Sequence, residues 1–164
     1  MTRNWYITEK IISLALIIWG GLLLYYSSRG ILLVSDFVSI QDFSVWTTFK
    51  YYHLLFILPL ATIIAGLLLL FDKRAGWTMA LITLLLNALV FLIPKDKYTD
   101  NFNSNDNGLI AFMLLSSIVC LTTFAILLFK PFQVKYNPTK KTWWTIAIIT
   151  SVILLDKTFI YWLS

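Results

Sequence analysis

Five apolar segments separated by short polar stretches constrain this chain more than any other feature of its sequence. They cover residues 11–34, 52–71, 75–94, 108–129 and 143–163, each of about 20 residues or slightly more. At about 1.5 Å per residue, a helix of this length crosses a hydrocarbon core of roughly 30 Å. Lipid offers the backbone no hydrogen bonds, so each segment must satisfy its own amide groups as a helix. The pattern predicts an all-α integral membrane protein, a bundle of five transmembrane helices forming a single domain over residues 1–164.

The composition agrees with lipid as the solvent of these segments. Of the 164 residues, 59% are hydrophobic and only 13% are charged, whereas a soluble domain carries about 25% charged residues. Cys120 is the single cysteine and His53 the single histidine. One residue of each kind excludes an intrachain disulfide and a metal cluster built from several cysteines or histidines. The sequence therefore predicts neither a metal site nor a cofactor.

Basic residues are unequally divided between the two ends of the apolar segments. If the N-terminus is cytoplasmic, eight lysines and arginines fall on the inner side and four on the outer side. Loops rich in lysine and arginine remain in the cytoplasm, so this bias predicts an inner N-terminus and an outer C-terminus. The inner set is Arg3, Lys10, Lys73, Arg74, Lys130, Lys135, Lys140 and Lys141, and the outer set is Arg29, Lys50, Lys95 and Lys97.

The stretch between the first two apolar segments is not plainly a soluble loop. Phe37 and Val38 lie on one side of a helical wheel, and Asp36 and Asp42 lie on another. This separation is typical of a helix that lies along the membrane surface. Residues 35–45 are therefore predicted to form an interfacial amphipathic helix on the outer face.

Asp156 and Lys157 are adjacent charged residues within the fifth apolar segment. An ionised group at that depth costs a few kcal/mol unless it pairs, reaches the headgroups or meets water. Successive residues on a helix point about 100° apart, so each of the two needs its own partner. One interpretation is a polar pocket or ion path that opens outward. The other is that Lys157 extends to the headgroups while Asp156 bonds a donor on a neighbouring helix.

Four further polar residues are candidates for a substrate or ion pathway. Arg29 and His53 lie at the outer ends of the first two segments, where either could approach Asp156. Asn87 and Ser116 lie near the middle of the third and fourth segments. Amides and hydroxyls at that depth hydrogen-bond across helices, either as structural contacts or as the lining of a pore.

Small residues at intervals along the segments indicate close helix packing. Gly20 and Gly21 remove side-chain bulk in the first segment, and small residues four positions apart recur in the second and fifth segments. Such residues allow helix backbones to approach within a membrane. The candidates for helix packing are Gly20, Gly21, Ala61, Ala65, Gly66, Ala147 and Ser151.

The chain carries no phosphate-binding glycine loop, serine nucleophile elbow or zinc-protease motif, and no aromatic and basic motif that reads bases. No catalytic residue is therefore assigned and no nucleic-acid partner is expected. The leading hypothesis is a non-enzymatic structural or regulatory subunit of a larger membrane complex, with the lipid bilayer and a membrane protein or a second copy as partners. The alternative is a small oligomeric transporter or channel, and an enzyme using Asp156 and His53 is a third. The expected location is a bacterial inner membrane.

Overall fold

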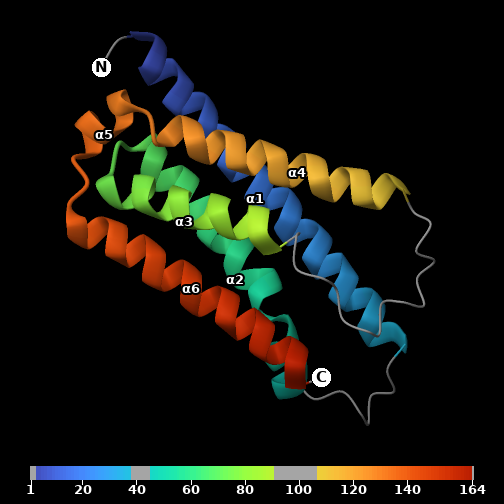
Figure 1. The fold of residues 1–164 in the computed structure, drawn as a ribbon. Helices are drawn as coiled ribbons and strands as arrows, with labels where there is room; N and C mark the ends of the chain where they lie inside the picture. Colours follow the sequence, from blue (N-terminus) through green and yellow to red (C-terminus); the bar gives the residue numbers. More distant parts are fainter. Residues whose placement is uncertain (1–2, 38–44, 91–106, 164) are drawn as a thin grey trace. The chain divides into compact units, whose positions relative to one another are not determined.

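A computed structural model describes residues 3–37, 45–90 and 107–163 of the chain, and these residues form six helices without strands (Figure 1). The predicted all-α fold is confirmed. The helices are α1 (Arg3–Phe37), α2 (Val45–Leu70), α3 (Arg74–Val90), α4 (Asn107–Leu127), α5 (Lys130–Tyr136) and α6 (Lys140–Leu163). The chain divides into two compact units, Thr2–Met79 and Ala80–Ser164, and each is described by itself. The predicted single domain stays a prediction.

Two of these helices are long and apolar enough to cross a membrane by themselves. They are the parts of α1 and α2 over Arg3–Arg29 and His53–Leu70. A third candidate combines Leu114–Leu127 of α4 with α5, although the two are bent by 62° where they meet. Two or three candidate spans indicate a membrane location for the chain. Within the described residues α3 is shorter and α6 is not among the candidates, so five spans remain a prediction.

Helix α1 is longer than the apolar segment that predicts it. It begins at Arg3 rather than near residue 11 and continues to Phe37 through the polar residues at positions 27–29. The Ser28 hydroxyl donates to the carbonyl of Leu24 at 2.7 Å, so this polar side chain is satisfied within the helix. With 35 residues, α1 is about 52 Å long and exceeds the thickness of a hydrocarbon core.

The predicted interfacial helix lies largely outside the described residues, which omit 38–44. At its two ends, residues 35–37 belong to α1 and Val45 begins α2. The third helix, predicted to end at residue 94, is described only to Val90. The fourth and fifth apolar segments correspond to α4 and α6 with boundaries that differ by a few residues.

Helices α1 and α2 form an antiparallel pair in the first unit and meet at two glycines (Figure 1). A Cβ atom added to Gly20 would lie 2.7 Å from Ile63 Cγ1 and 2.8 Å from the Pro59 carbonyl oxygen. A Cβ atom added to Gly66 would lie 2.8 Å from both Ile17 Cγ1 and the Ser13 carbonyl oxygen. Each helix therefore contributes one glycine that admits the backbone of the other, as in close packing of membrane helices.

Helix α5 is a short element that the sequence did not predict. Residues 130–141 contain four lysines and two prolines, a composition typical of a loop. The helix forms because Pro131 lies in its first turn, where a missing amide hydrogen costs nothing, and because Phe132 and Tyr136 are buried one turn apart. The Gln133 side-chain nitrogen also donates to the Leu128 carbonyl at 2.6 Å.

Candidate functional site

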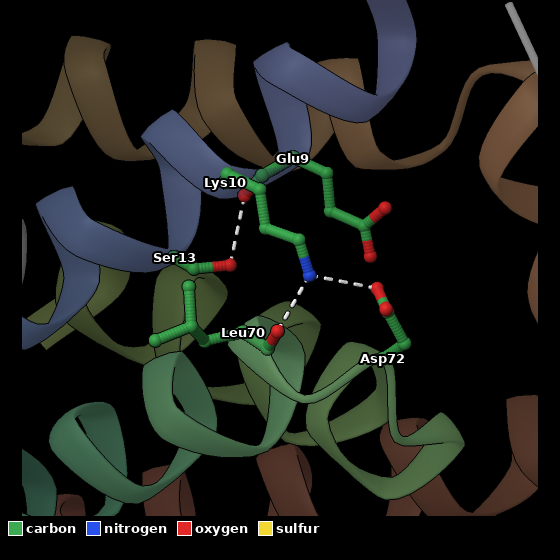
Figure 2. A network of polar contacts seen from close by, with 5 residues as sticks. All are labelled: Glu9, Lys10, Ser13, Leu70 and Asp72. Carbon is green, nitrogen blue, oxygen red and sulfur yellow. Dashed lines mark hydrogen bonds and ion pairs between the residues drawn. The ribbon is translucent and has the colours of Figure 1, made fainter. Parts of the chain in front are cut away.

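The main polar network of the first unit lies where α1 begins and α2 ends. Lys10 Nζ donates to the Leu70 carbonyl oxygen at 2.5 Å and forms an ion pair with Asp72 Oδ1 at 2.9 Å (Figure 2). The Lys10 side chain is 21% exposed and that of Asp72 is 44% exposed. The cation thus joins the beginning of one helix to the end of the next.

The local sequence explains why Asp72 lies there. Helix α2 ends in a Schellman motif, in which the amide of Asp72 donates to Leu69 at 3.0 Å and the amide of Lys73 donates to Leu68 at 2.9 Å. Asp72 has a φ of 58°, a left-handed conformation that aspartate tolerates better than most residues. Leu70 is the last residue of α2, and Lys10 supplies a donor to its carbonyl from α1. Lys10 therefore completes the C-terminal cap of α2.

Glu9 precedes Lys10 and is fully buried. Its backbone carbonyl accepts a hydrogen bond from the Ser13 hydroxyl at 2.8 Å, and Figure 2 shows its side chain extending toward the end of the network where Asp72 lies. The Lys10 ammonium also lies 4.9 Å from the centroid of the Tyr6 ring, a distance suited to a cation–π contact. One cation is thus surrounded by a carbonyl, a carboxylate and an aromatic ring, which stabilises its charge at the end of the hairpin.

This arrangement holds α1 and α2 together. The Lys10 ammonium donates to the Leu70 carbonyl and to the Asp72 carboxylate. Within residues 3–37, 45–90 and 107–163, no group of three or more histidine, cysteine, aspartate or glutamate residues lies close enough to hold a metal ion. The network is best described as a structural site.

Sequence analysis did not single out Glu9, Lys10 or Asp72 beyond their charge. The sequence nonetheless contains a signal that predicts the contact between Lys10 and Asp72. Consecutive transmembrane helices are antiparallel, so the residues that precede the first apolar segment share a membrane face with those that follow the second. A lysine at one of these places and an aspartate at the other predict an ion pair.

The residues predicted to line a pathway are divided between the two units. Arg29 and His53 belong to the first, and Asn87, Ser116 and Asp156 belong to the second. Arg29 is exposed, with its guanidinium 5.7 Å from the Tyr25 ring centroid. His53 is half-buried. The proposed approach of either residue to Asp156 stays a prediction.

Asn87 and Ser116 are buried in α3 and α4, with 2% and 6% of their surfaces exposed. Asn87 Nδ2 donates to the Thr83 carbonyl at 2.8 Å, and the Ser116 hydroxyl donates to the Phe112 carbonyl at 2.7 Å. Each bond returns to the preceding turn of the same helix. The hydroxyl of the adjacent Ser117 donates across to the Ala88 carbonyl of α3 at 3.2 Å, a contact between helices of the kind expected for hydroxyls at this depth.

Asp156 is half-buried in α6, and Lys157 follows it in the same helix. Of the residues predicted to pack helices, Gly20, Ala65 and Gly66 are buried and Ala61 is half-buried. Gly21, Ala147 and Ser151 are exposed. A Cβ atom added to Gly21 would meet nothing within 4 Å, so the two adjacent glycines of α1 have different surroundings.

Comparison with known proteins identifies no relative of the chain. No protein-family model matches the chain, and no curated protein or solved structure matches it either.

Proposed function

We propose that the chain is a non-enzymatic structural or regulatory subunit of a membrane complex. The observation that supports it most is which acceptors the polar side chains of the apolar helices bond to. Many donate to a carbonyl three or four residues earlier in the same helix, which gives each of these side chains an acceptor within its own helix. These donors are Ser13, Ser28, Thr62, Thr83, Asn87, Ser116, Thr122, Thr123 and Thr158.

The glycine contacts and the Lys10 cap support the same proposal. They fix α1 against α2 at three levels along the pair, through Gly20, Gly66 and the contact between Lys10 and Leu70. A hairpin held in this way is suited to a component that packs against another membrane protein or a second copy. We propose five spans because of the five apolar segments and an inner N-terminus because of the uneven distribution of basic residues. The proposed location is a bacterial inner membrane.

Co-purification tests the proposal. The tagged full-length chain, expressed at native level and extracted in a mild detergent, is expected to elute with one membrane protein, or with itself, at fixed stoichiometry. Mass spectrometry and size-exclusion chromatography with light scattering measure the identity and ratio of the components. A chain that elutes only as a monomer in every mild detergent would contradict the proposed role.

A small oligomeric transporter or channel is the second candidate, with a site around Asn87, Asp156 and Lys157. One observation favours it. The Thr150 hydroxyl of α6 is buried and has no hydrogen-bond partner among the described residues. A helical threonine ordinarily donates to a carbonyl one turn earlier, and a buried hydroxyl without a partner is often satisfied by water.

Cysteine accessibility distinguishes the two candidates. In a chain whose Cys120 is replaced by serine, single cysteines at positions 87, 116, 150 and 156 are treated with a membrane-impermeant thiol reagent. A structural subunit is expected to leave positions 87, 116 and 150 unlabelled, because all three are buried. Labelling at position 150 together with position 87 or 116 would favour a water-filled path and the transport function.

A further inference from the structure

The segment from Phe129 to Trp144 carries the most concentrated positive charge of the chain. It comprises the residue before α5, α5 itself, the turn that follows and the first five residues of α6, and it contains Lys130, Lys135, Lys140 and Lys141. Residues 107–155 contain no aspartate or glutamate. The segment, here called the basic linker, therefore has no acidic residue near it in the sequence.

Two of these lysines occupy positions where their charge is unfavourable for the helix. Lys140 and Lys141 lie in the first turn of α6, which contains no acidic residue. The helix dipole places a partial positive charge at this end, so an acidic side chain there would stabilise the helix and a lysine does not. Thr139 and Thr142 cap the turn with neutral hydroxyls instead. Charge that is unfavourable within the chain points to a negatively charged partner outside it.

Large apolar side chains are exposed beside the lysines. Val134 on α5 is 71% exposed, Phe129 directly before α5 is 51% exposed, and Trp144, the fifth residue of α6, is 68% exposed. Phe132 and Tyr136 on the other side of α5 are buried and hold the short helix in place. The linker thus presents cations and apolar groups together, whereas a purely aqueous loop would expose mainly polar groups.

We propose that the basic linker binds the headgroups of anionic phospholipids. A headgroup region offers phosphate to lysine ammonium groups and hydrocarbon just below it to valine, phenylalanine and tryptophan. An acidic protein surface would match the lysines, but it would leave the exposed Val134 and Trp144 in water. The inference uses the membrane location indicated by α1 and α2 and is independent of which complex the chain joins.

Lipid binding by the purified full-length protein tests this inference. The protein in detergent is titrated with dioleoyl phosphatidylglycerol or dioleoyl phosphatidylcholine at low ionic strength, and native mass spectrometry measures the bound lipid. The wild type is expected to prefer phosphatidylglycerol, and this preference should fall as salt is added. Each lysine near an anionic surface contributes about 1 kcal/mol, so the triple variant Lys130→Gln, Lys140→Gln, Lys141→Gln should bind phosphatidylglycerol roughly a hundredfold more weakly.

Replacing the same three lysines by arginine retains the charge and is expected to retain the preference. Circular dichroism of both variants reports whether the helices persist. Equal binding of the two lipids by the wild type would overturn the inference, as would unchanged phosphatidylglycerol binding by the glutamine variant. Loss of a stoichiometric protein partner from the glutamine variant, with its lipid binding unaffected, would assign the linker to an acidic protein surface instead.

Discussion

Gly20→Ala and Gly66→Ala are each expected to lower the free energy of unfolding by about 1–3 kcal/mol, the usual cost of overpacking a well-packed contact. In both cases the added Cβ would lie 2.8 Å from a carbonyl oxygen of the opposite helix. A backbone atom cannot move aside by rotating a side chain, so the whole helix must shift. Unfolding in mixed micelles of dodecyl maltoside and sodium dodecyl sulfate, followed by circular dichroism, measures the change.

Gly21→Ala is the matched control. It adds the same methyl group to the same helix one residue later, where nothing lies within 4 Å. The change should be neutral or stabilising by up to about 1 kcal/mol, because alanine is the better helix former. If all three variants lose the same stability, the contacts of Gly20 and Gly66 with the opposite helix are not what holds the hairpin.

Lys10→Met is expected to destabilise the first unit by about 2–3 kcal/mol. Methionine keeps much of the apolar stem but removes the donor to the Leu70 carbonyl, and hydrogen bonds to charged groups contribute about 1.5–3 kcal/mol. The ion pair is the smaller contribution, since the Asp72 side chain is 44% exposed and exposed pairs contribute about 0–1 kcal/mol. The cap should therefore matter more than the ion pair.

Asp72→Asn separates these two effects. Asparagine tolerates the left-handed conformation at this position and removes the charge while leaving Lys10 free to cap Leu70. Its cost should not exceed about 1 kcal/mol. Arg29→Met is the control for the loss of a charge alone, because it removes an exposed cation from α1, the helix that also contains Lys10. If Asp72→Asn lowers the free energy of unfolding more than Lys10→Met does, the ion pair and not the cap is the larger contribution.

The helical fold could be predicted from the sequence because lipid leaves an apolar segment of this length few alternatives. Helix α5 could not, because its seven residues carry no long apolar run and depend on the burial of Phe132 and Tyr136. The sequence predicts the start of α1 too late for a related reason. Five of the eight residues 3–10 are polar or charged, and the contact of Lys10 with the end of α2 is a tertiary one.

The glycine contacts show which features the sequence predicts and which depend on how the helices pack. Gly20 and Gly21 are equivalent as small residues, yet they point about 100° apart on the helix. Only the angular position of α2 around α1 decides which of them is at the contact. In the same way, the identity of Asn87 and Ser116 predicts a hydrogen bond at mid-membrane depth, but the acceptor depends on the rotamer.

Whether α6 crosses the bilayer decides whether the chain is a five-span protein. Reporter fusions of alkaline phosphatase and green fluorescent protein, joined after Lys141 and after Ser164, measure this in bacterial cells. We expect a cytoplasmic signal after Lys141 and the opposite signal after Ser164, since the positive charge before α6 remains inside. The same signal at both positions would contradict this expectation, because α6 would then lie on one side of the membrane.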